Sequence, residues 1–165
     1  VYSGRDGRFD LVLLTGIRTM AYHHSRFRNH SWARKIQDAP ELRIHPKTAQ
    51  RLNVGPDDWV WVHTASGTGR ALLRAWLTEE VPEEIVATGM GWWYPEIAGA
   101  DRGSLTFNVD AAIAYGPPWD PISGSPESRN VACSVSRADP QDVPEHLRAF
   151  LAKSPAEETS TTAIA

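Results

Sequence analysis

Three segments of this chain combine residue types that bind anions. The first contains Gly16 and Arg18 and then the basic run His23, His24, Ser25 and Arg26. Glycine lets a ligand approach the backbone closely, arginine offers a two-pronged donor for phosphate, and serine and histidine add hydrogen bonds. This segment therefore suits a pyrophosphate or a nucleotide. A solvent-exposed basic loop is the alternative interpretation.

The second segment is aromatic. Residues 89–96 read Gly-Met-Gly-Trp-Trp-Tyr-Pro-Glu, directly after an expected strand. The ring of Trp93 is suited to stacking on a planar ligand, and the carboxylate of Glu96 to accepting hydrogen bonds from a guanine edge. The alternative is that these large rings pack in the core at one end of the fold.

The third segment is rich in small hydroxyl residues. Residues 121–126 read Pro-Ile-Ser-Gly-Ser-Pro, and Arg129 lies four residues after Ser125. Such a segment makes a cradle for a phosphate or a ring amide, or else a plain turn. Asn108 and Asp110 are spaced to lie on one side of an extended segment, from which they can read donors of a ligand.

Signals for covalent or metal chemistry are weak. Position 127 is Glu127, so Ser125 does not lie in a Gly-x-Ser-x-Gly elbow, and the glycine-rich nucleotide motifs are missing. Cys133 lies within an apolar strand and is expected in the core. Adjacent His23 and His24 point apart on an extended chain and have no acidic or thiol neighbour in sequence, so no metal ligand is assigned. Ligand binding without a catalytic residue is favoured.

The composition of the chain indicates which classes of binding partner and which compartments are favoured. The 165 residues carry 17 basic and 20 acidic side chains, a net charge of -3, which does not favour nucleic acid or an anionic membrane. No apolar run approaches the roughly 18 residues that span a bilayer. A single cysteine cannot form an internal disulfide and favours a reducing compartment, while cytoplasm and periplasm both stay open. The first residue is Val1, which suggests a piece of a longer polypeptide.

The elements that must position these segments are mainly strands. Apolar and alternating patterns predict strands over residues 9–14, 41–45, 59–63, 70–77, 85–88 and 131–136. Residues 17–30 are predicted to form a long loop, residues 47–52 a helix that begins at Pro46, and residues 66–69 a hairpin turn. The strand over residues 131–136 is needed to close a barrel, because an open edge invites pairing with other chains.

Taken in order, these segments resemble the C-terminal molybdopterin-dinucleotide-binding domain of the dimethyl sulfoxide reductase family of molybdenum and tungsten enzymes. The resemblance runs from about residue 9 to residue 137 and is carried by residues 14–16 with the His-Ser-Arg run, 40–49, 58–62, 91–96 and 121–125 with Arg129. It implies a mainly β fold with short helices, a six-stranded double-psi β-barrel of the aspartate decarboxylase-like type. The expected organisation is a linker over residues 1–8, the barrel domain over 9–138, an extension over 139–152 with a short helix over 143–151, and a disordered tail over 153–165.

The resemblance also implies a cofactor and partners. The cofactor is molybdopterin guanine dinucleotide, with molybdenum or tungsten held by another domain. Its contacts would be Gly16, Arg18, His23, His24, Ser25 and Arg26 in the first loop, and Trp93, Glu96, Asn108, Ser125 and Arg129 in later loops. The partners would be the remaining domains of the same catalytic subunit, with an iron–sulfur electron-transfer subunit as a further candidate.

The chain departs from the family pattern at three places. Ile17 is inserted before Arg18, Asp57 stands where the family often has glycine, and Asp110 stands where it often has asparagine. The aromatic block is similar to the branch that holds thiosulfate or polysulfide reductase-like, arsenic oxyanion reductase-like and acetylene hydratase-like proteins. The substrate is not encoded in this domain.

Two other functions remain open at this stage. One is a standalone double-psi barrel used for partner or peptide recognition, which would not need the basic loop. The other is a small decarboxylase that cleaves itself at a Gly-Ser bond, for which Gly103-Ser104 and Gly124-Ser125 are the candidate positions. An intact mass near 18.3 kDa would exclude this second function.

Overall fold

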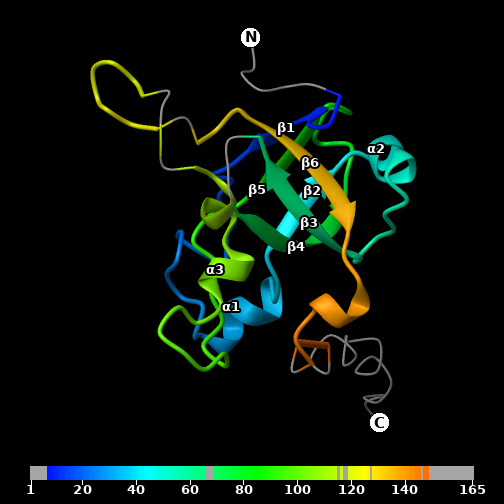
Figure 1. Cartoon of the computed structure of the whole chain (residues 1–165). Coiled ribbons are helices and arrows are strands. Elements are labelled where there is room, and N and C mark those ends of the chain that lie inside the picture. The colour runs from blue at the N-terminus through cyan, green and yellow to red at the C-terminus, as the bar shows by residue number, and fades with distance from the viewer. Residues whose placement is uncertain are drawn as a thin grey trace.

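The computed structural model describes residues 7–65, 69–114, 116, 119–126, 128–145 and 147–148 (Figure 1). Its strands are β1 (Leu11–Leu14), β2 (Glu41–Ile44), β3 (Trp59–Thr64), β4 (Arg70–Leu77), β5 (Ile85–Thr88) and β6 (Val131–Arg137). Its helices are α1 (Ser31–Ile36), α2 (Pro46–Arg51) and α3 (Ser104–Phe107), with 3₁₀ turns η1 (Val109–Ala112) and η2 (Pro140–Asp142).

The six strands close into one barrel in the order β1-β5-β2-β4-β3-β6. The β1–β5 and β2–β4 pairs are parallel, and the other four pairs are antiparallel. Exchanging the first three strands with the last three reproduces the same neighbours, so the barrel has an internal twofold arrangement. The predicted six-stranded double-psi barrel is confirmed, and β6 closes it against both β1 and β3 as expected.

Alternation along the strands builds two apolar cores. Val60 and Val62 point into the barrel, whereas Trp61 between them faces outward. The inner core is formed by buried aliphatic side chains together with Cys133, as predicted for that cysteine. The outer core packs loop and helix residues against the barrel wall: Ala21, Tyr22, Ala33, Trp61, Leu72, Trp92, Tyr94, Phe107, Ala138, Val143 and Leu147. Because side chains alternate across a strand, one strand supplies both cores.

All six predicted strands are present, and α2 begins at Pro46 as predicted. The short helices α1 and α3 and the turn η1 were not predicted. The interpretation of residues 108–110 as an extended segment is wrong, because Asn108 instead caps η1 and accepts a hydrogen bond from the backbone N–H of Asp110. The hairpin turn, the helix over 143–151, the linker and the tail lie partly or wholly outside the described residues. Within the described residues, no helix is both long and apolar enough to cross a bilayer.

Candidate cofactor-binding site

Two long loops leave neighbouring strands at the same end of the barrel. The β1–α1 loop (residues 15–30) follows β1, and the β5–α3 loop (residues 89–103) follows β5. Because β1 and β5 are parallel partners, their carboxyl ends lie side by side. The backbone N–H of Ile17 donates to the carbonyl oxygen of Thr88 at 3.2 Å. Parallel pairing thus brings together two segments that are about 70 residues apart in sequence.

The two loops are in close contact at Gly91. This residue has a φ of +75°, and a Cβ there would lie 2.8 Å from the backbone nitrogen of Ser25. The N–H of Gly91 donates to Oδ1 of Asn108 at 2.8 Å, and Nε1 of Trp93 donates to the carbonyl oxygen of Ser25, also at 2.8 Å. Three residues predicted from sequence, Ser25, Trp93 and Asn108, therefore meet at this junction.

The cationic residues of the β1–α1 loop share one electrostatic environment. The pKa of His23 is lowered by desolvation and then by its electrostatic interactions with His24, Arg18 and Arg26. The rings of His23 and His24 meet edge to face with centroids 4.8 Å apart, and the backbone of His24 is left-handed with a φ of 53°. The turn therefore concentrates positive charge where the sequence placed an anion site.

Arg129 joins this end of the barrel from the segment before β6. The hydroxyl of Thr15 donates to the carbonyl oxygen of Ser128 at 2.6 Å, which holds the two segments together. Gly16 has a φ of +82°, and a Cβ on it would lie 3.9 Å from Nε of Arg129. The positive φ favours glycine at this position, and a Cβ there would also lie 3.2 Å from Cε of Met90.

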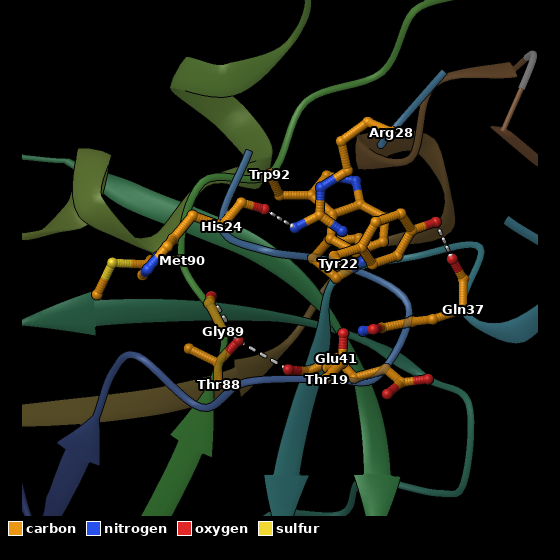
Figure 2. Close-up of a pocket in the computed structure, with 11 residues that line it drawn as sticks. Thr19, Tyr22, His24, Arg28, Gln37, Glu41, Thr88, Gly89, Met90 and Trp92 are labelled. Atoms are coloured by element: carbon orange, nitrogen blue, oxygen red, sulfur yellow. Dashed lines mark hydrogen bonds between the residues drawn. The ribbon is translucent and has the colours of Figure 1, made fainter. Parts of the chain in front are cut away.

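Arg28 lies near the end of the β1–α1 loop, and its side chain is buried (Figure 2). Its guanidinium lies between the rings of Tyr22 and Trp92, 3.9 Å and 3.7 Å from their centroids. Nη2 donates to the carbonyl oxygen of His24 at 3.0 Å. Burial lowers the pKa of Arg28 to about 10, and no ion pair with it is found in the part of the chain that the structure describes. A buried cation without a carboxylate partner is unusual, because the charge loses its hydration.

A polar cavity of about 20 Å³ adjoins this arginine, as the close-up in Figure 2 shows. Several buried polar atoms that line it lack a hydrogen-bond partner among the described residues: Thr19 Oγ1, Arg28 Nε and Nη1, Gln37 Oε1 and Trp92 Nε1. Glu41 also lines the cavity, and burial raises its pKa while Arg74 opposes that rise. Three of the unpartnered atoms are N–H donors, so the cavity favours hydrogen-bond acceptors.

Arg28 belongs to the basic segment that the sequence singled out, but it was not among the predicted cofactor contacts. It lies in the same basic run as Arg26, but its aromatic neighbour Trp92 is 64 residues away, so its burial has no local signature. The run of basic residues in the sequence draws attention to Arg28, but it does not distinguish a buried arginine from an exposed one.

Two predicted residues have other contacts. Glu96 forms an ion pair with Arg34 of α1. Ser125 lies on the segment before β6, drawn in yellow where it projects from the body in Figure 1, and its hydroxyl is 3.0 Å from that of Ser123. Neither contact places these side chains at the junction of the two loops.

Comparisons with known proteins identify the family of this chain. The family model described as "Molydopterin dinucleotide binding domain" matches residues 11–132. Dopamine dehydroxylase of Eggerthella lenta is 32% identical over 136 residues, which cover 82% of this chain and 13% of the relative. Acetylene hydratase of Syntrophotalea acetylenica is 30% identical over 127 residues, covering 73% of this chain and 17% of the relative.

A solved structure supports the same assignment. Acetylene hydratase from Pelobacter acetylenicus superposes with a TM-score of 0.71 at 26% identity, covering 79% of this chain and 18% of that structure. The chain thus spans less than a fifth of the length of these relatives. It belongs to the molybdopterin dinucleotide-binding domain family and is homologous to the C-terminal domains of molybdenum and tungsten oxidoreductases.

Proposed function

We propose that this chain binds molybdopterin guanine dinucleotide with the β1–α1 loop, the β5–α3 loop and Arg129, as one domain of a larger oxidoreductase subunit. One contrast among its arginines carries the proposal. Five arginines elsewhere form ion pairs with carboxylates: Arg34, Arg43, Arg51, Arg74 and Arg137. No ion pair of Arg18, Arg26 or Arg129 is found across the described residues. Arg70 and Arg102 also lack an ion pair there, but Arg70 lies over the ring of Trp61 and Arg102 donates to the carbonyl oxygen of Pro95.

The residues at this end fit the chemistry of a dinucleotide. A pyrophosphate carries negative charge and needs arginine forks and backbone that it can approach, which Arg18, Arg26 and Gly16 supply. The redox chemistry belongs to the bound cofactor and its metal, whereas this chain would bind and orient the dinucleotide. A partner-recognition barrel leaves the cluster of unpaired arginines without a role.

The relatives are several times longer than this chain, so further domains of the same subunit are the proposed partners. Large apolar side chains are exposed on the β1–α1 loop and on α1, and they are the candidates for that contact: Met20, Phe27, Trp32 and Ile36. Isolated exposed apolar residues are common, but neighbouring ones mark interaction surfaces. An iron–sulfur subunit is a second proposed partner.

The test compares two triple variants of equal charge. We expect Arg18→Ala/Arg26→Ala/Arg129→Ala to weaken binding of the dinucleotide at least about 100-fold, because each charge-assisted hydrogen bond is worth about 1.5–3 kcal/mol. The ligand is the cofactor released from a purified molybdenum oxidoreductase, and equilibrium dialysis measures its affinity.

The control variant is Arg43→Ala/Arg51→Ala/Arg137→Ala, which removes three arginines that are already paired with carboxylates. It should bind within about threefold of the wild-type chain, since salt-screened charges at a distance contribute little. Equal losses in the two variants would show that net charge, and not this site, attracts the ligand.

A further inference from the structure

The segment that follows β6 packs on the outer core of the barrel. We call its described residues, 138–145 and 147–148, the strap; they are drawn in orange after β6 in Figure 1. The strap buries Ala138, Val143 and Leu147 in the outer core, with exposed fractions of 8%, 3% and 3%. The inner core contains none of the described strap residues, so the strap covers the barrel without filling it.

Two hydrogen bonds attach the strap to β3. The N–H of Ala138 donates to the carbonyl oxygen of Trp59 at 2.8 Å, and Nε1 of Trp61 donates to Oδ2 of Asp142 at 2.8 Å. The same carboxylate oxygen accepts from the N–H of Asp139 at 3.2 Å. The bond from Trp61 lowers the pKa of Asp142, which keeps this acceptor ionised at neutral pH. The strap is therefore held by its first turn.

A row of aromatic rings leads from this attachment to the two cofactor loops. Trp59 meets Phe107 with ring centroids 6.0 Å apart, and Phe107 meets Tyr94 at 4.9 Å. Tyr94 meets Trp92 at 5.8 Å, and Trp92 meets Tyr22 at 5.4 Å. All four contacts are edge to face, the geometry that aromatic pairs favour. The row ends on both loops, since Trp92 belongs to the β5–α3 loop and Tyr22 to the β1–α1 loop.

The strap and the two loops leave the barrel at opposite ends. β6 is antiparallel to β1, whereas β5 is parallel to β1, so the carboxyl end of β6 lies opposite to those of β1 and β5. The outer core is thus the packed connection between the strap and the loops. Because protein interiors are close-packed, a change at one side of such a cluster displaces its neighbours. The family match ends at residue 132, before the strap begins.

We propose that the strap is a positioning element for the β1–α1 and β5–α3 loops. By closing the outer core through Trp61, Val143 and Leu147, it keeps the row of rings in place and holds the loops in one arrangement. The effect on the loops does not depend on the ligand that they bind. Its consequence, a tighter hold on the dinucleotide, rests on the proposed function.

The first experiment weakens the strap with Val143→Ala in the full chain. Nuclear magnetic resonance follows hydrogen–deuterium exchange at two protected amides of the β5–α3 loop, without ligand. These are the N–H of Gly91, bonded to Oδ1 of Asn108, and the N–H of Tyr94, bonded to the carbonyl oxygen of Arg102. We expect both to exchange about tenfold faster than in the wild-type chain, because the loosened outer core opens more often.

Val81→Ala is the matched control. Val81 lies on the β4–β5 connection and is 7% exposed, but it belongs to neither core. The substitution removes the same methyl groups from an equally buried valine. Exchange at Gly91 and Tyr94 should stay within about threefold of the wild-type rate, since this position has no packed connection to the loops. Circular dichroism checks that each variant is folded.

A milder variant, Trp61→Phe, removes only the donor to Asp142. The aromatic ring stays, so the contact with Arg70, whose guanidinium lies 3.7 Å from the centroid of the Trp61 ring, is kept in kind. We expect about threefold faster exchange at Gly91 and Tyr94, because one hydrogen bond of the strap is lost. This variant keeps the test decisive if Val143→Ala does not fold.

Two results would overturn the proposal: unchanged exchange at Gly91 and Tyr94 in the folded strap variants, or equal acceleration in Val143→Ala and Val81→Ala. The exchange rates are measured without ligand, so they are independent of the proposed function. Dinucleotide affinity of the arginine triple variant tests that function separately. If both hold, Val143→Ala should also bind the dinucleotide at least about threefold more weakly, whereas Val81→Ala should not.

Discussion

At the residue scale, Arg28 combines a positive charge with a buried position. The residue is 4% exposed, and its guanidinium is bounded by Tyr22 and Trp92, with a hydrogen bond to the carbonyl oxygen of His24. The two aromatic faces attract the charge and offset part of its lost hydration. The hydrogen bond links the buried guanidinium to the loop segment that carries the predicted cofactor contacts.

Two substitutions of Arg28 separate its effect on folding from its effect on binding. Arg28→Met keeps an elongated side chain between the rings, so the free energy of unfolding should change by less than about 1 kcal/mol. Arg28→Ala leaves a gap and should lower it by about 3 kcal/mol. Both variants should bind the dinucleotide about tenfold more weakly, because both lose the hydrogen bond that Arg28 donates to the carbonyl oxygen of His24 in the binding loop. Urea unfolding followed by circular dichroism and equilibrium dialysis give the two quantities.

The opposite pattern would assign Arg28 a purely structural role. In that case Arg28→Met would be as unstable as Arg28→Ala, while the folded fraction would bind the dinucleotide with wild-type affinity.

The residue types in the sequence predicted part of the candidate site, but not the hydrogen-bond and ion-pair partners of its side chains. The aromatic and glycine pattern singled out Trp93, and the structure brings it to Ser25 as a neighbour. The ion pair between Glu96 and Arg34 was not visible in the sequence, since Arg34 lies on α1, 62 residues from Glu96. Long-range ion pairs of this kind decide which carboxylates remain available.

At the element scale, the site depends on the contact between the β1–α1 and β5–α3 loops. Both loops pack on the outer core through Tyr22, Trp92 and Tyr94, with Tyr22 and Trp92 meeting edge to face at 5.4 Å. Gly91 permits this contact in two ways, through its positive φ and through the absence of a Cβ next to Ser25. The loops are thus positioned by packing and not by hydrogen bonds alone.

Gly91→Ala tests that contact directly. The added Cβ would lie 2.8 Å from the backbone nitrogen of Ser25, so the loops must separate. We expect the free energy of unfolding to fall by about 2–3 kcal/mol, because backbone strain and overpacking act together. We also expect the dinucleotide to bind at least about tenfold more weakly. Urea unfolding and equilibrium dialysis measure the two effects.

Gly124→Ala is the matched control, because Gly124 also has a positive φ, +69°, but no atom lies within 4 Å of the position that a Cβ would take there. The free energy of unfolding of this control should fall by only about 1 kcal/mol, because of backbone strain, and its affinity for the dinucleotide should be unchanged. Similar effects of the two substitutions would show that strain, and not loop contact, is responsible.

Strands were more predictable than helices. The patterns at β3 and β5 extend over enough apolar or β-branched residues to identify them from sequence. By contrast, α3 has four residues and α1 has six, with one buried residue each, so neither shows an amphipathic period. Short helices of this kind are stabilised by packing and not by their own propensity.

At the scale of the whole molecule, the barrel gathers remote segments at one end. The parallel β1–β5 pair brings two loops together, and the antiparallel β1–β6 pair adds the segment that carries Arg129. The strand order and closure follow from the resemblance, whereas local patterns alone predict only separate strands. The register between strands is set by which residues enter the inner core.

The central claim is that this end of the barrel holds the dinucleotide. The most direct measurement is hydrogen–deuterium exchange of the chain, with and without cofactor released from a purified molybdenum oxidoreductase. The account predicts slower exchange at residues 16–26 and 89–94, and unchanged exchange at α2, which follows β2, a strand antiparallel to β5 and therefore ending at the other end of the barrel. Protection at α2 with none in the two loops, at saturating ligand, would contradict it.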